Sequence, residues 1–276
     1  MGRFGLPIGI VLAALILGCG PGKELPQQVI EPVASRPIPV DPLGKAPAES
    51  DPEAKAVLER AVKAITQGDI KRLESLKACI VNYRGRVHFP NIASATDATL
   101  VLEVQWPTRA RATFGFQGVF PTITFRYIEP FGWMNRGGQE QEGDQSEVGR
   151  FIRNDFLLRC ALPLGIPLAD PHTIAFEAKK DNGVATVKVA TRDAPLMLVT
   201  FDAKTGLPTG VESHPLELTN QRTKKTLTFS EHKPQDGLLL PTKVESTENG
   251  RPAETWTLDK LQFLDKIDPA VFEKPK

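Results

Sequence analysis

The sequence has few of the residues that build metal and nucleophilic sites. It contains three cysteines and four histidines in 276 residues. The histidines His88, His172, His214 and His232 stand apart, with no i, i+4 pair among them, as is typical of solvent-facing histidines. Ser213 lacks the flanking glycines of a nucleophile elbow. We therefore predict no catalytic residue, no metal ligand, no cofactor and no enzymatic activity.

The chain also lacks an excess of charge of either sign. It has 34 lysines and arginines against 33 aspartates and glutamates, a net charge of +1, and no basic stripe. Nucleic-acid-binding proteins usually show such a stripe, so we predict no nucleic-acid partner. The acidic run Glu140, Glu142, Asp144 and Glu147 lacks the regular ligand spacing of a calcium loop and indicates a solvated loop.

The apolar run at the N-terminus is too short for a comfortable transmembrane helix. It covers residues 8–17 after the positive Arg3, whereas a membrane span needs about 20 residues. This layout is typical of a secretory signal peptide. Residues 16–19, Ile-Leu-Gly-Cys, resemble the bacterial lipobox, in which the cysteine is acylated and the preceding peptide is removed.

The lipobox resemblance implies a signal peptide at 1–18 and a membrane anchor through a lipid such as palmitate on Cys19. The alternatives are an uncleaved membrane anchor and a plain secretory peptide with a chance cysteine. In all three cases the rest of the chain leaves the cytoplasm.

Residues 19–50 are rich in proline and poor in aromatic residues. Such a segment buries no core and tends to an extended form, so it predicts a tether. With Cys19 acylated, two thiols are left, Cys79 and Cys160. The sequence leaves two alternatives for them: a disulfide, as exported proteins allow, or two small buried apolar side chains.

Residues 51–276 predict a single domain of α+β class, mostly antiparallel β. Asp51 as N-cap, Pro52 in the first turn and Gly68 as the stop signal predict a helix, and a shorter helical piece follows it. Another helical region is predicted at 144–161, ended by Pro163. Residues 129–133 are expected to interrupt the strands. Strands are predicted at 82–89, 100–106, 112–116, 123–127, 174–178, 184–190, 196–201, 207–213, 226–231, 238–246 and 254–263.

About ten or eleven strands in one antiparallel sheet curl because twist accumulates. We therefore predict a curled sheet or incomplete β-barrel, with amphipathic helices packed on its concave face. In the last strand the apolar face shifts between Trp256-Leu258 and Leu261-Phe263, which predicts a bulge or a bend.

Aromatic side chains gather in the first half of this domain. Most of them are expected to fill the core, and some to line a cavity. The candidate cavity-lining residues are Trp106, Phe114, Phe116, Phe125, Trp133 and Phe151.

Several turn sequences in residues 51–276 resemble those of the LolA and LolB type of periplasmic lipoprotein carriers and outer-membrane receptors. They are FGW at 131–133, FDAKTGLP at 201–208, DGLLLPTKV at 236–244 and IDPAVFEKP at 267–275. The resemblance implies an incomplete β-barrel closed by helices, with an apolar cavity for acyl chains. These motifs are structural and carry little information on function.

Two departures from the carrier pattern bear on function. The soluble carriers have an arginine directly before a proline on an early strand, where this chain has Trp106 before Pro107, with Arg109 and Arg111 nearby. The carriers also lack an anchor, so the lipobox favours a stationary, receptor-like role.

Three functional hypotheses follow. The first is a monomeric, lipid-anchored envelope protein that binds an acyl chain, lipid or lipoprotein and faces the periplasm, with the outer membrane slightly favoured. The second is an envelope scaffold whose cavity is filled. The third, an envelope enzyme, needs convergent titratable groups that the sequence does not show.

Overall fold

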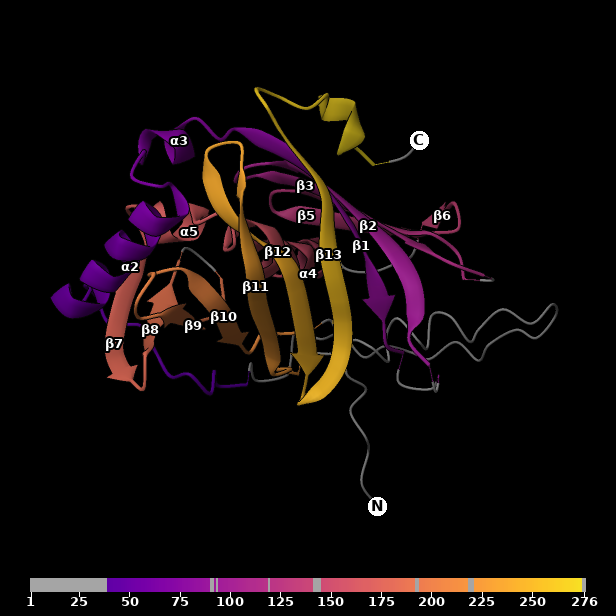
Figure 1. Ribbon diagram of the computed structural model, residues 1–276. Coiled ribbons are helices and arrows are strands. Elements are labelled where there is room, and N and C mark those ends of the chain that lie inside the picture. Colours follow the sequence, from indigo (N-terminus) through magenta and orange to yellow (C-terminus); the bar gives the residue numbers. More distant parts are fainter. Residues whose placement is uncertain are drawn as a thin grey trace, which may run out of the picture.

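The structure, a computed structural model, describes residues 39–89, 92, 94–118, 120–140, 145–191, 194–217 and 221–274 (Figure 1). The predicted signal peptide, Cys19 and most of the predicted tether lie outside these residues. The helices are α2 (Pro52–Ile65), α3 (Lys71–Glu74), α4 (Gln145–Phe156), a π-helical segment (Leu157–Ala161), α5 (Ile166–Ala169) and a 3-10 turn (Pro269–Val271).

All strands belong to one antiparallel sheet of 13 strands, which curls without closing into a barrel. Its order is β6-β5-β4-β3-β2-β1-β13-β12-β11-β10-β9-β8-β7. The strands are β1 (Ala78–Val87), β2 (Thr96–Gln105), β3 (Arg109–Phe116), β4 (Ile123–Ile128), β5 (Phe131–Arg136), β6 (Gln139–Glu140), β7 (Ile174–Asp181), β8 (Val184–Ala190), β9 (Met197–Asp202), β10 (Pro208–Ser213), β11 (Lys225–Gln235), β12 (Leu238–Glu248) and β13 (Arg251–Leu264). The predicted fold class is confirmed.

The sheet has more strands than the sequence predicts, because residues 129–133 do not interrupt it. Ile128 pairs directly with Phe131, so Glu129 and Pro130 form a two-residue hairpin loop between β4 and β5. The short β6 then adds to β5. The expectation of a break at 129–133 was wrong because a tight turn and an interruption carry the same Pro and Gly signals.

The pairing of β1 with β13 joins the first and last of the described strands and makes one sheet of two meanders. Asn82 pairs with Lys260 and Tyr83 with Leu258, so Asp259 is an extra residue on β13. This bulge confirms the predicted shift of the apolar face and brings Trp256 and Leu261 into the same interior.

Helix α2 begins and ends as its sequence predicts. The Asp51 carboxylate accepts a hydrogen bond from the Glu53 backbone N–H at 2.9 Å, and Gly68 takes a positive φ of 94° just past the end. Its buried face carries Leu58, Val62 and Ile65 and packs on β7 and β8. None of the helices in the described part of the chain is both long enough and apolar enough to span a bilayer.

The end of the predicted tether packs on the sheet. Leu43 is buried with Phe176 and Leu196. The Ser50 hydroxyl accepts a hydrogen bond from the Ala175 N–H of edge strand β7, and the Asp51 N–H donates one to the Ala175 carbonyl. We call residues 39–50 the strap. Residues 39–50 therefore belong to the folded part of the chain, and they cover backbone groups that an edge strand leaves open.

Helix α4 lies on the concave side of the sheet, against β3, β4 and β5 (Figure 1). With its π-helical continuation it fills the region predicted as helix at 144–161. The helix reaches β5 at a contact between two glycines: a Cβ added to Gly149 would lie 2.2 Å from the Pro130 carbonyl oxygen and 3.0 Å from the Gly132 nitrogen. The backbones can approach this closely only because both residues lack a Cβ.

We expect Gly149→Ala to destabilise the protein by about 1–3 kcal/mol, because steric overlap with backbone outweighs the gain of up to about 1 kcal/mol in helix propensity. Urea unfolding measures the change. Gln145→Ala, at an exposed position of the same helix, should change the free energy of unfolding by less than about 0.5 kcal/mol. A Gly149→Ala protein as stable as the wild type would show that α4 does not sit this close to β5.

Candidate functional site

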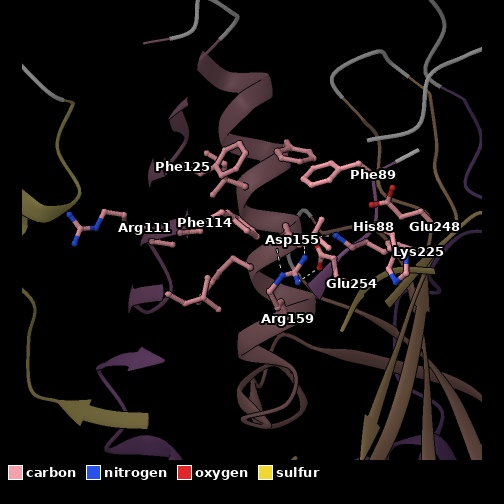
Figure 2. A pocket seen from close by; sticks show the side chains of 18 residues that line it. His88, Phe89, Arg111, Phe114, Phe125, Asp155, Arg159, Lys225, Glu248 and Glu254 are labelled. Carbon is pink, nitrogen blue, oxygen red and sulfur yellow. Dashed lines mark hydrogen bonds and ion pairs between the residues drawn. The ribbon is translucent and has the colours of Figure 1, made fainter. Parts of the chain in front are cut away.

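A cleft runs between α4 and the concave side of the sheet (Figure 2). Its volume is about 820 Å³, open mouth included, and much of it consists of narrow spaces between side chains. Its apolar lining comes from β1, β2, β3, β4, β13 and α4. These residues are Val87, Phe89, Leu102, Ala110, Ala112, Phe114, Phe125, Phe151, Ile152, Phe156 and Ala253.

Half of the predicted cavity-lining residues lie on the wall of this cleft. Phe114 and Phe125 come from adjacent strands and meet edge to face, with ring centroids 6.0 Å apart and an interplanar angle of 85°. Phe151 of α4 faces Phe125 at 6.0 Å. The three rings form a continuous aromatic surface that joins the sheet to the helix.

The other three predicted residues lie elsewhere. Phe116 packs nearly parallel to Phe114 at 6.3 Å, outside the cleft lining, because the register of β3 places it two residues further along the strand. Trp106 borders a separate pocket together with Tyr127 and Leu157. Trp133 is half-buried on β5, and its indole N–H has no hydrogen-bond partner among the described residues.

Charged side chains form the floor of the cleft. Arg159, in the π-helical segment, is only 2% exposed. It donates two hydrogen bonds to the Asp155 carboxylate, both at 3.1 Å, and a further one to Glu254 of β13. Lys225 of β11 donates to the same Asp155 carboxylate. Figure 2 shows Asp155, Arg159 and Glu254 pointing toward one another below the aromatic wall. We call these four residues the ion cluster.

Asp155 and Lys225 of the ion cluster hold their charges at neutral pH. Burial alone would raise the pKa of Asp155, but the charges of Arg159 and Lys225 and their hydrogen bonds outweigh burial and hold that pKa well below its usual range. Burial opposes the charge on Lys225 as well, and the neighbouring Asp155 carboxylate nevertheless raises its pKa. The floor is therefore ionic but closely paired, with two positive and two negative groups.

Glu217 lies close to the ion cluster and behaves differently. It is 2% exposed, and no described residue donates a hydrogen bond of normal geometry to either of its carboxylate oxygens, although the Thr223 hydroxyl is nearby. Burial raises its pKa from about 4.5 to about 8, because Lys225 compensates only partly. Glu217 is thus mostly protonated at pH 7.

Sequence reasoning did not find the ion cluster. The one local signal is the i, i+4 pair of Asp155 and Arg159 within an apolar helical pattern, which is equally typical of an exposed helix face. Lys225 and Glu254 come from distant strands, and only the sheet register brings them to α4. In the described part of the chain, no three His, Cys, Asp or Glu side chains gather in a way that could hold a metal ion.

Comparisons with solved structures identify the fold. A LolA superfamily protein from Nitrosomonas europaea is similar over 80% of this chain and 97% of its own, with a TM-score of 0.50 and 11% identity. A DUF1329 family protein from Desulfovibrio piger covers 81% and 98% (TM-score 0.49, 11% identity). A putative outer membrane lipoprotein-sorting protein domain from Vibrio parahaemolyticus covers 79% and 97% (TM-score 0.44, 12% identity).

No protein-family model matches the sequence, and no curated protein is significantly similar to it. The first of the three structural similarities shows that the chain has a LolA-type fold, as the turn sequences predict.

We expect Arg159→Met to destabilise the protein by about 3–5 kcal/mol, because it leaves the Asp155 and Glu254 carboxylates buried without their main partner. Urea unfolding at pH 7 measures the loss. The matched control is Arg84→Met: Arg84 pairs with Asp259 at 3.1 Å on the surface, and its loss should cost about 1 kcal/mol at most. Equal losses for the two variants would contradict a buried ion cluster.

We also expect stability to depend on the protonation of Glu217. Its folded-state pKa lies above its unfolded value, so its contribution is complete below about pH 4.5 and is lost as pH rises through about 8. Glu217→Gln should remove this loss, which is on the order of 3–5 kcal/mol.

The measurement for Glu217 is urea unfolding of wild type and Glu217→Gln at pH 5, 6.5 and 8.5. The difference between the two proteins cancels the titration of the groups that they share. The variant should gain stability relative to wild type as pH rises, and parallel profiles would show that the Glu217 carboxyl is not shifted.

Proposed function

We propose that this chain, with its LolA-type fold, is a lipid-anchored protein of the cell envelope that holds an acyl chain of a lipid or lipoprotein in the cleft beside α4. The observation that carries the proposal is the aromatic wall of Phe114, Phe125 and Phe151 facing an open apolar space. Apolar side chains from the sheet and from α4 line most of this space, as is usual for small-molecule sites.

Binding of this kind needs no chemical step. An acyl chain gains roughly 0.8 kcal/mol for each CH₂ that leaves water, so apolar walls suffice for affinity. The mouth of the cleft is bordered by exposed His88 and half-buried Glu248 and Ala253, which would leave a polar head group in contact with solvent. The ion cluster closes the floor, and its paired charges favour no particular head group there. On this proposal the protein is not an enzyme.

The anchor and location belong to the same proposal. A lipid on Cys19 would hold the protein at a membrane, facing the periplasm, with the outer membrane slightly favoured, and residues 20–38 would separate the strap from that membrane. Such a protein would act as a stationary monomer that receives lipid or lipoprotein. The absence of an arginine before Pro107 in the sequence also separates it from the shuttling carriers.

A second candidate function is an envelope scaffold that binds no lipid. It is favoured by the way α4 already occupies the concave face, where Ile152, Phe156 and Leu157 are buried. In this case the apolar space beside α4 would be a packing defect of a filled half-barrel, and protein partners would bind elsewhere.

Blocking the mouth of the cleft tests the first candidate. In the full chain carrying Cys19→Ser, we expect Ala253→Trp to weaken binding of a dansyl-labelled fatty acid at least tenfold, about 1.4 kcal/mol, because the indole would occupy the space that the acyl chain enters. Fluorescence titration measures the affinity, and native mass spectrometry of protein from envelope extract shows whether a lipid co-purifies.

Ala178→Trp is the matched control, because Ala178 is half-buried on β7, away from the cleft. It should bind the probe as the parent does. A parent protein with a clean apo mass and no uptake of the fatty acid or of an added lipopeptide would reject lipid binding and favour the scaffold.

A further inference from the structure

We propose that Cys79 and Cys160 form a disulfide bond that ties the C-terminal, π-helical end of the α4 region to the central strand β1. The structure holds both residues as buried free thiols. It also brings them close together: Cys79 borders a small apolar pocket with Phe156 and Leu164, which lie four residues before and four residues after Cys160. The sequence left this pair as either a disulfide or two unrelated buried residues, and only the fold brings them together.

The two thiols come from parts of the chain that lie far apart in the sequence. Cys79 lies near the start of β1, between Val104 of β2 and Phe263 of β13 in the sheet register. Cys160 lies in the π-helical segment directly after Arg159. About 80 residues separate them, so a bond here closes a long loop, the case in which a disulfide restricts the unfolded chain most.

Formation of the bond is a two-electron oxidation. Each thiol loses its proton and the pair gives up two electrons to a disulfide oxidant, either oxidised glutathione or the disulfide of an oxidoreductase. That oxidant is reduced to two thiols while one S–S bond forms. The reaction passes through a mixed disulfide and needs a thiolate as attacking group.

Burial decides when this exchange can occur. The neighbouring Cys79 side chain and burial both raise the pKa of the Cys160 thiol, so the folded protein contains little thiolate to react. The bond should therefore form during folding, before Cys79 and Cys160 are covered. Once formed, it would be shielded from reductants by the same burial.

The bond would matter for the cleft because it fixes the element that carries the floor. Arg159 precedes Cys160, and β1 contributes Val87 to the opposite wall. The in-cell bond rests on the proposed export from the cytoplasm, because an oxidising compartment is needed there. The contact between the thiols does not depend on that proposal.

The test uses the full chain carrying Cys19→Ser, unfolded in urea and refolded in a glutathione redox buffer. We expect mass spectrometry after iodoacetamide treatment in urea, without reductant, to find neither Cys79 nor Cys160 alkylated, and a digest to contain a peptide pair linked through them. The oxidised form should melt roughly 5–15 °C above the same protein treated with dithiothreitol.

Cys79→Ala in the same background is the control, because its melting temperature should not respond to dithiothreitol. A protein that refolds to the native circular dichroism spectrum in the oxidising buffer, yet is alkylated at both Cys79 and Cys160, would overturn the proposal.

Protein isolated directly from cells separates this proposal from the proposed location. Bonded thiols support both. Reduced thiols in cells together with bond formation in the redox buffer support the disulfide and contradict an oxidising location.

Discussion

The structure depends on the docking of α4 against the concave face of the curled sheet. A sheet of 13 strands that curls without closing leaves an apolar interior that some element must cover. The contact between Gly132 and Gly149 lets the helix backbone reach β5, which sets the position of everything further along the helix. The aromatic wall, the buried charges and Cys160 all take their places from that contact. The cleft is the part of the trough that α4 leaves uncovered.

The ion cluster shows how a polar group can belong to an apolar interior. Burying charges costs several kcal/mol for each ion, and the cost is offset only where partners and hydrogen bonds are complete. Here Arg159 bridges two carboxylates and Lys225 adds a second cation to one of them. This pairing links α4 and its π-helical continuation to β11 and β13. Glu217, with no comparable partner, keeps its proton instead.

Local signals predicted the strands well, because each hairpin carries its own turn chemistry. Asn182 and Gly183, or Asn249 and Gly250, adopt the positive φ values that such turns require, and these residues are adjacent in sequence. The cleft could be predicted only in part. The alternation of side chains along β3 and β4 correctly places Phe114 and Phe125 on the wall of the cleft. Phe116 follows the same alternation, and only its position further along β3 keeps it out of the lining. The ion cluster needs the pairing of β1 with β13, and no local pattern encodes that pairing.

The strap gives the fold a defined response to force. Arg222 donates hydrogen bonds to the Pro39 carbonyl at 2.8 Å and to the Asp41 carboxylate at 3.2 Å, while Leu43 is buried beside Phe176. Tension applied to the chain upstream of Pro39 therefore reaches these contacts before it reaches helix α2. The load is shared between β7 and the segment after β10, two places far apart in the sequence. The contacts of the strap therefore have to break before a pull on the N-terminal segment can unwind helix α2.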